Sequence, residues 1–488
     1  MANKNVSQER MKAKTLFLLL LAMALMSGGV ARQRVFSVSG RVIDTSGEGV
    51  EGVVVNNGRQ FTQTDQDGRW SLLTDTLVSK YISISTPADF CLPAADGIAA
   101  GFYVSVGEAI AQKGHDFVLR RRTHKADDFY YVAISDPQVR NESDLRRWRE
   151  ETMADVRRMA DSLGGEREVV GVTLGDLVFD DMALYAPYAQ SVSNSGMTMF
   201  SCIGNHDFDR RWKDLDSMRL GTPVYAEKEY NERFGPTDYS FNIGKAHVVT
   251  MKNINYLGNG RYVERMTDEQ LEWLANDLSY VPRGSLVLLN IHAPGWGSVN
   301  KGDIMSGADR LAEVLRGYRV HVFCGHTHYF QNVEVSERLY QHNIGAACGA
   351  WWQGKVNCCG APNGYLVVSV EGDCLRWRYR ATGTSPDVQM SVYGQGEWPS
   401  LAEDIVANVW DYDPRCRVEW WQDGRAMGAM DRFSAVDVAY QSQSGPRSMR
   451  IATSHLFRCR PKGRYKKIDI VFTNRFGERF REVVKGES

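Results

Sequence analysis

Five clusters of polar residues, each of which follows an apolar run, hold most of the side chains in this chain that could bind a metal ion. They occur in the order Asp136-x-Gln138, Gly175-Asp176, Gly204-Asn205-His206-Asp207, His292 and Gly325-His326-x-His328. Carboxylate, imidazole and amide-oxygen donors in such a mixture suit borderline or harder ions such as manganese, iron or zinc. The chemistry that this set favours is hydrolysis assisted by metal ions.

The apolar runs ahead of these clusters are predicted to be β-strands that alternate with helices. We expect strands at residues 130–135, 169–174, 197–203, 285–291 and 320–324, and helices at residues 145–163, 267–278 and 306–316. The second helix opens on Thr267-Asp268-Glu269-Gln270, which has the spacing of a capping box. Strands that alternate with helices predict an α/β domain. Because the carboxyl ends of strands border the ligand crevice of an α/β sheet, we expect the clusters to converge at one edge of a single sheet.

The order of these clusters resembles the calcineurin-like metallophosphoesterase superfamily, whose signature runs D-x-H, GD, GNH[DE], a lone His, and GHxH. The resemblance covers about Phe129 to Ala350, and five motifs in the same order make it specific. It implies a layered β-sandwich flanked by helices. It also implies a metal-dependent phosphoesterase, either a phosphatase or a phosphodiesterase.

The resemblance also assigns ligands to two divalent or trivalent ions, with manganese, iron or zinc as candidates. One ion would be held by Asp136, Gln138 and His328, the other by Asn205, His292 and His326, and Asp176 would bridge them. A metal-bridging hydroxide would then attack phosphorus, and His206 would protonate the leaving group. Two divalent ions, two carboxylates and a hydroxide leave a net charge of about +1, which attracts a phosphate.

Two positions depart from the family pattern. Gln138 stands where the family more often has histidine, so the first ion is expected to bind more weakly. Phe179 stands where purple acid phosphatases have tyrosine and protein phosphatases have aspartate, so the sequence supports neither subgroup. Asp207 is the second catalytic candidate, and the sequence leaves open whether Asp180 or Asp207 orients His206.

Three further residues are candidates for contact with substrate. Arg140 follows the first cluster, and Trp351 and Trp352 follow the last one. The two tryptophans equally fit a packing role between domains. His321, which alternates with Val320 and Val322, is expected to be a buried structural residue.

The rest of the chain predicts export and two flanking β-rich domains. Residues 1–31 have basic residues, an apolar run and small residues in the order of a bacterial secretory signal peptide, so a periplasmic or extracellular location is expected. The apolar run is too short for a membrane span of about 20 residues. Residues 32–122 resemble carboxypeptidase-regulatory-like, transthyretin-like β-modules, residues 126–352 form the predicted catalytic domain, and residues 360–488 form a C-terminal β-rich domain.

Composition and motifs exclude some functions and leave others open. The formal net charge of -1 gives no sign of a nucleic-acid-binding surface. The chain contains no HExxH pair, which argues against a metallopeptidase. We expect hydrolysis of phosphate mono- or diesters on a small molecule, lipid head group or glycan, and the alternative is a non-catalytic surface or glycan-binding protein with a vestigial metal site. Nine cysteines are compatible with some disulfides and leave at least one unpaired.

Overall fold

The computed structural model describes residues 35–486, except residues 125, 166, 213–222, 298–300 and 444–450. The predicted signal peptide therefore lies outside the described residues. Across the described ranges, no helix combines the length and the apolar character needed to cross a bilayer. All nine cysteines are described and each is free, so the structure contains none of the disulfides that the cysteine count allowed.

Two mixed β-sheets, packed face to face, form the centre of the molecule. The first has the strand order β22-β21-β10-β11-β12-β7-β6, with bounds β6 Ala94–Ala95, β7 Ile98–Ala99, β10 Asp128–Ile134, β11 Glu168–Leu174, β12 Thr198–Cys202, β21 Gly364–Glu371 and β22 Cys374–Ala381. The second has the order β13-β14-β17-β18-β20-β19, with bounds β13 Tyr239–Ile243, β14 Ala246–Thr250, β17 Leu286–Asn290, β18 Arg319–Cys324, β19 Gln331–Ser336 and β20 Leu339–Asn343. A short hairpin, β15 Ile254–Gly258 and β16 Arg261–Glu264, follows β14.

The inner faces of these sheets form one apolar core. Strands β10, β11 and β12 pair in parallel, as do β14, β17, β18 and β20. Strands covered on both faces are nearly continuous apolar runs, as in these segments. Tyr131 spans the interface, because its hydroxyl donates to Asn290 Oδ1 at 2.7 Å and its ring lies 5.4 Å from that of Phe323.

Helices cover the outer faces of both sheets. The first sheet is covered by α3 Glu142–Arg147, a π-helical turn Trp148–Met153, α4 Ala154–Leu163, α5 Tyr185–Ser193 and α7 Lys228–Phe234. The second sheet is covered by α8 Asp268–Leu278 and α9 Ala308–Val314. The predicted capping box is present, since the Thr267 hydroxyl accepts from Gln270 N and the Gln270 side chain accepts from Thr267 N. The predicted layered β-sandwich flanked by helices is confirmed.

The five predicted strands are present, but the expectation that they share one sheet is wrong. Strands β10, β11 and β12 belong to the first sheet, whereas β17 and β18 belong to the second. Periodicity along the chain reports that a segment is a buried strand but not which strand it pairs with. The polar clusters therefore converge from the edges of two facing sheets.

The N-terminal region is a β-sandwich that also contributes to the first central sheet. Its two sheets are β4-β1-β9 and β3-β2-β5-β8, with bounds β1 Val35–Asp44, β2 Val54–Asn56, β3 Phe61–Gln63, β4 Arg69–Asp75, β5 Tyr81–Ser85, β8 Tyr103–Ser105 and β9 Phe117–Leu119, and with one helix, α2 Val106–Ala111. The short strand β7 pairs with β12 of the central sheet. Met199 opposite Ile98 marks this junction.

The C-terminal region consists of two four-stranded sheets with their own core. Their orders are β23-β24-β28-β27 and β26-β25-β29-β30, with bounds β23 Met390–Tyr393, β24 Ile405–Val409, β25 Arg417–Gln422, β26 Arg425–Ala429, β27 Asp431–Ala435, β28 Thr453–Cys459, β29 Lys467–Thr473 and β30 Arg479–Lys485, and α10 is Val438–Ser442. Strands β21 and β22 precede them but join the first central sheet through β10. The domain boundary expected at residue 360 therefore falls ahead of two strands of the central sheet, because apolar alternation does not identify a strand's partners.

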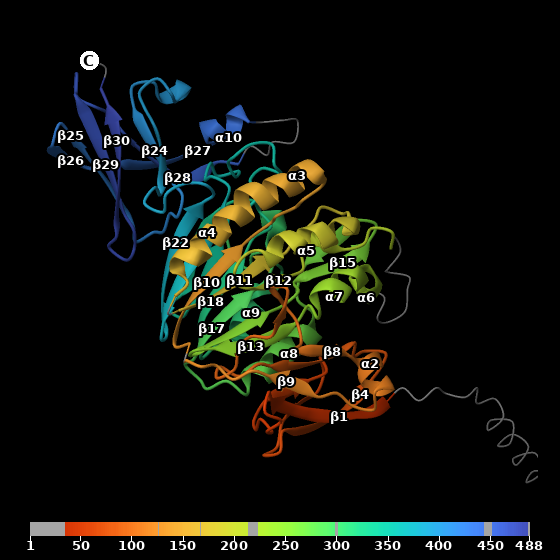
Figure 1. Cartoon of the computed structure of the whole chain (residues 1–488). Helices are drawn as coiled ribbons and strands as arrows, with labels where there is room; N and C mark the ends of the chain where they lie inside the picture. The colour runs from red at the N-terminus through yellow and green to blue at the C-terminus, as the bar shows by residue number, and fades with distance from the viewer. Residues whose placement is uncertain are drawn as a thin grey trace, which may run out of the picture.

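Figure 1 shows how the three parts are arranged. The red N-terminal sandwich, with β1 and β4, lies at the bottom, and the blue C-terminal sheets lie at the upper left. The central sheets lie between them, with α3 and α4 crossing the front of the first sheet.

Candidate metal centre

The backbone takes unusual conformations where the strands of the two sheets end. Twelve described residues other than glycine have positive φ, and eight of these are Asp136, Gln138, Asp176, Asp180, His326, His328, Trp351 and Trp352. A positive φ strains most residues other than glycine, and such strain is concentrated at functional sites. Five of these eight positions belong to the polar clusters that the sequence singled out, and the other three follow a cluster along the chain.

Two motif glycines are required because other groups approach them closely. A Cβ atom on Gly204 would collide with the Asp176 carboxylate, and one on Gly325 would collide with Ser135 and with the Asp136 carboxylate. Only glycine lets the turns after β12 and β18 come this close to the two aspartates. The glycines thus bring ligand-bearing turns from both sheets into contact.

Three potential ligand atoms from other residues lie close to Nε2 of His292. Its Nε2 lies 3.0 Å from Asn205 Oδ1, 3.1 Å from His326 Nδ1 and 3.4 Å from Asp176 Oδ1. Its Nδ1 donates to the carbonyl of Leu174 at 2.7 Å, which leaves a lone pair on Nε2 facing the other donors. This arrangement is what a single metal ion requires.

A second group of donors lies on the other side of Asp176. His328 donates from Nδ1 to the Gly349 carbonyl at 2.6 Å, and its Nε2 lies 3.6 Å from Asp136 Oδ1. That oxygen is buried and has no hydrogen-bond partner among the described residues. Gln138 Nε2 donates to Asp176 Oδ2 at 2.7 Å, so the amide nitrogen of Gln138, and not its oxygen, faces the bridging candidate.

The electrostatics of the cluster match a bound cation. Burial would raise the pKa of Asp176, but His292 and His206 outweigh it and hold that pKa well below its ordinary range. Burial opposes protonation of His292, yet the carboxylates of Asp176 and Asp136 raise its pKa to about 9. The two buried carboxylates therefore favour a positive charge close to them. A divalent ion would supply that charge and would also contact the Asp136 oxygen that has no hydrogen-bond partner among the described residues. The residues present fit two metal ions.

His206 lies beside this cluster and is oriented by Asp180. Its Nδ1 is 2.9 Å from Asp180 Oδ1, and its ring stacks on Phe179 with centroids 3.8 Å apart. Burial lowers the pKa of His206, but Asp176 and Asp180 outweigh it, so the net shift is upward. Arg210 Nε holds the same Asp180 oxygen at 2.7 Å. The imidazole is therefore fixed with Nε2 as its free nitrogen.

The carboxylate of Asp207, the second predicted catalytic residue, accepts hydrogen bonds from backbone amides, whereas the His206 ring is held by Asp180. The fully buried Asp207 carboxylate accepts from Leu177 N at 3.0 Å and from Gly204 N at 2.9 Å. Tyr185 donates a further hydrogen bond to its backbone carbonyl at 3.0 Å. The carboxylate thus joins the turns after β11 and β12, and the residue that orients the histidine is Asp180.

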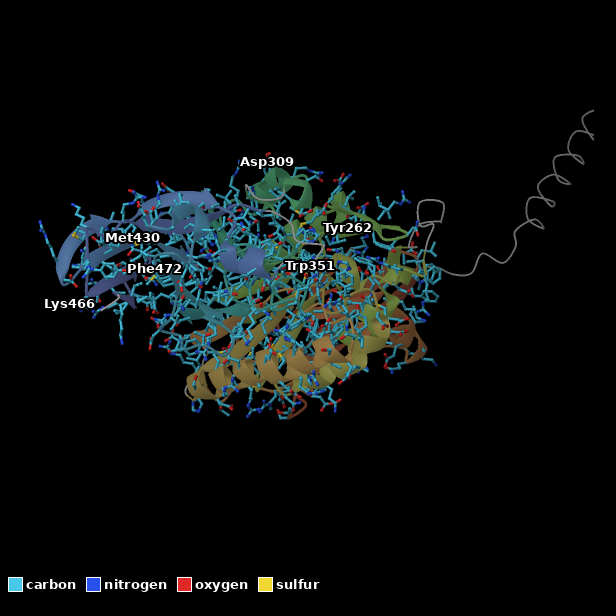
Figure 2. All side chains as sticks on the ribbon, turned by 90° about the horizontal axis from the view of Figure 1, so that it is seen from above. Tyr262, Asp309, Trp351, Met430, Lys466 and Phe472 are labelled. Atoms are coloured by element: carbon cyan, nitrogen blue, oxygen red, sulfur yellow. The ribbon has the colours of Figure 1, made fainter. Side chains whose placement is uncertain are left out.

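The three candidate substrate residues have different surroundings. Trp351 stacks on His328 with centroids 4.6 Å apart, which puts its ring against the cluster. Trp352 is buried, and its Nε1 donates to the Pro137 carbonyl at 2.9 Å, which is a packing role. Arg140 forms an ion pair with Asp144 at 2.6 Å. Figure 2 shows Trp351 in the central part of the molecule, and it belongs to a hydrophobic cluster that includes Tyr440 and Val436 of the C-terminal region.

Sequence reasoning missed two groups that support the cluster. Glu264, at the end of β16, lies with Oε1 3.3 Å from His326 Nε2. Asn253 accepts at Oδ1 from the backbone N–H of His292 at 3.0 Å. Neither residue belongs to a recognisable motif, and both lie near the short hairpin, so no signal in the sequence could have identified them.

Comparisons with known proteins identify the family. A family model described as calcineurin-like phosphoesterase matches residues 129–330. Models described as the N terminal and the C terminal of calcineurin-like phosphoesterase match residues 36–122 and 341–480. The fold and the paired ligand groups define a class of dinuclear metal-dependent phosphoesterases, which are hydrolases. The chain belongs to the calcineurin-like phosphoesterase family.

Similar solved structures are distant. A dimetal phosphatase from Danio rerio is 15% identical, covering 52% of this chain and 96% of that chain, with a TM-score of 0.37. A purple acid phosphatase from yellow lupin (Lupinus luteus) seeds is 11% identical, covering 67% of each chain, with a TM-score of 0.38. A structure of PhoD is 9% identical, covering 94% of this chain and 87% of that chain, with a TM-score of 0.33. No curated protein matches the chain.

Proposed function

We propose that this protein hydrolyses phosphate mono- or diesters outside the cytoplasm, with two metal ions and with His206 as the general acid. The observation that carries the proposal is the meeting of Asp176, Asn205 and His326 donors within 3.0 to 3.4 Å of His292 Nε2. Metal-dependent hydrolysis of phosphoesters is the activity of the family that matches residues 129–330.

The proposed ligands fall into two groups joined by Asp176. Asp136 and His328 would hold one ion, and the group around His292 would hold the other. Gln138 would orient Asp176 through its Nε2 donor and would bind the first ion through Oε1 only after its amide rotates. Manganese, iron and zinc suit this donor set. When bound, the two ions supply Lewis acidity and an activated water at the phosphoryl group.

His206 would move a proton to the leaving group. Its Nδ1–H donates to Asp180, so Nε2 is the nitrogen available to the reaction. The raised pKa of His206, which comes from Asp176 and Asp180 acting against burial, keeps a larger fraction protonated near neutral pH. A protonated imidazole held in one orientation is a suitable general acid. Phe179 fixes the ring plane through its stacking contact.

The substrate is proposed to be a phosphorylated small molecule, a lipid head group or a glycan. Trp351, stacked on His328, offers an apolar wall beside the phosphoryl position, and Arg140 is the cationic candidate that the sequence supplies. The proposed location rests on the signal-peptide pattern of residues 1–31.

The test is an assay of purified protein from Gln33 onward on matched chromogenic mono- and diesters. The protein is loaded in turn with manganese, iron or zinc. We expect turnover that depends on metal and falls at least about a hundredfold in His292→Ala. No turnover on any ester with metal bound would reject catalysis and favour a binding protein with a vestigial centre.

A further inference from the structure

A cavity at the junction of the N-terminal sandwich and the catalytic domain lies outside the metal centre. Its volume is about 370 Å³, which is within the range of ~300–1,000 Å³ typical of small-molecule sites. The N-terminal sandwich contributes Lys80 and Tyr81 to its wall, and the catalytic domain contributes Asn231, Lys252 and Trp273. None of the proposed metal ligands lines it.

Asn231 is the feature that points to a ligand. It lies on α7, is 7% exposed and lines the cavity, and its side-chain Oδ1 has no hydrogen-bond partner among the described residues. Its backbone is fully used within the helix, because its N–H donates to the Glu227 carbonyl and its carbonyl accepts from Gly235. A buried amide oxygen without a partner costs stability, so its presence needs an explanation.

The other buried polar groups of the cavity already have partners. Lys252 is paired with the Glu227 carboxylate. Asp238 accepts from Lys252 N at 2.8 Å and from Gln270 Nε2 at 3.1 Å. The whole lining holds three basic residues and three acidic residues, so its formal charges cancel and leave no surplus with which to hold an ion. Asn231 stands apart from them as an unsatisfied neutral group.

We propose that this cavity binds a neutral saccharide. A sugar hydroxyl both donates and accepts, so it can satisfy Asn231 whichever way the amide is turned. Tyr81, which lines the same cavity and is only partly buried, offers apolar ring surface for the C–H face of a sugar. Lys80, which is exposed and lines the cavity, offers a donor. The N-terminal sandwich would thus complete a binding site that the catalytic domain alone lacks.

The experiment measures sugar binding to the signal-free full-length protein by calorimetry and saturation-transfer NMR. The probes are glucose, galactose, mannose and N-acetylglucosamine, with glucuronate and inorganic phosphate as charged comparisons. We expect at least one neutral sugar to bind, and to bind more tightly than either charged probe. Asn231→Leu should weaken that binding about tenfold, and Lys80→Ala, an exposed substitution that spares the core, about threefold. Asn194→Leu, at an exposed helix end, is the matched control and should leave the dissociation constant within about twofold.

Thermal stability provides a second readout that separates a ligand-binding role from a structural one. If Asn231 is kept for a ligand, Asn231→Leu should raise the melting temperature of the sugar-free protein, because it removes an unsatisfied buried amide. A lower melting temperature together with unchanged sugar affinity would overturn the proposal, as would binding of none of the four neutral sugars. Phosphoester turnover should stay unchanged in Asn231→Leu, so the outcome is independent of the catalytic proposal.

Discussion

Replacing Asp180 with asparagine tests how the proposed general acid is positioned. Asp180 Oδ1 lies 2.9 Å from His206 Nδ1, and both side chains are mostly buried, with exposed fractions of 17% and 16%. The substitution keeps the shape of the side chain and removes its charge. We expect His206 to lose both a favourable charge and a fixed acceptor for Nδ1–H.

The size of the effect follows from the geometry. At an effective dielectric constant near 20, unit charges about 4 Å apart interact by up to ~4 kcal/mol, and partial solvent access reduces this to about 1–2 kcal/mol. Loss of that energy should lower the pKa of His206, because the protonated imidazole loses a favourable charge. General acid catalysis contributes ~10²–10⁴-fold, so loss of charge and orientation should lower kcat by about 10–100-fold.

The assay compares two esters that differ in their leaving group. An alkyl phosphate needs a proton on the departing oxygen, whereas a 4-nitrophenyl phosphate does not. Asp180→Asn should therefore lower kcat mainly on the alkyl ester, and the alkaline limb of its pH profile should move to lower pH. Asp181→Asn is the matched control, since Asp181 is exposed and its side chain accepts only from the nearby Ala183 N–H at 3.1 Å. Equal loss on both esters, or an unmoved alkaline limb, would refute the positioning role.

Three further predictions concern the metals and the fold. Gln138→His should tighten binding of the first ion by adding an imidazole ligand, measured as metal retained during dialysis against a chelator, and equal retention would remove the argument that Gln138 weakens this site. Asp207→Ala should lower the free energy of unfolding in urea by ~3 kcal/mol or more, because it leaves the buried N–H groups of Leu177 and Gly204 without an acceptor. Burial raises the pKa of Asp411 to about 8, from an unfolded value of 3.8. The folded chain therefore holds this proton more tightly than the unfolded chain, and the free energy of unfolding falls as pH rises from about 4 to 8. The melting temperature of Asp411→Asn should rise relative to that of the parent protein as pH increases across that range. If the melting temperatures of the two proteins change in parallel with pH, this explanation is wrong.

Most of the candidate ligands could be singled out from the sequence because they sit in local motifs, and the structure brings them close together. Gly204 and Gly325 lie in turns where a side chain would collide with an aspartate, and both glycines are part of the motifs. The polar residue after each apolar run could therefore be assigned to a strand end. The alternation of strands and helices predicted the α/β class, whereas the layered sandwich followed from the resemblance to the family.

The partners of these residues were harder to predict because they depend on the tertiary fold. Which of Asp180 and Asp207 orients His206 could be decided only from the folded turns. Asp180, in the turn after β11, adopts a φ of 64°, and Asp207, in the turn after β12, accepts from backbone amides. Glu264 reaches His326 from a hairpin with no motif. The pairing of β21 with β10, which extends the catalytic sheet past the predicted boundary, is likewise a long-range contact that periodicity does not report.

The most direct test of the account is metal content measured together with turnover on the same samples. Purified protein, protein stripped with a chelator and protein reloaded with each candidate ion are compared by elemental analysis and by hydrolysis of a phosphate ester. The account predicts about two ions per chain in the active samples, loss of activity on stripping and recovery on reloading. Full turnover by stripped protein that retains no metal would contradict it.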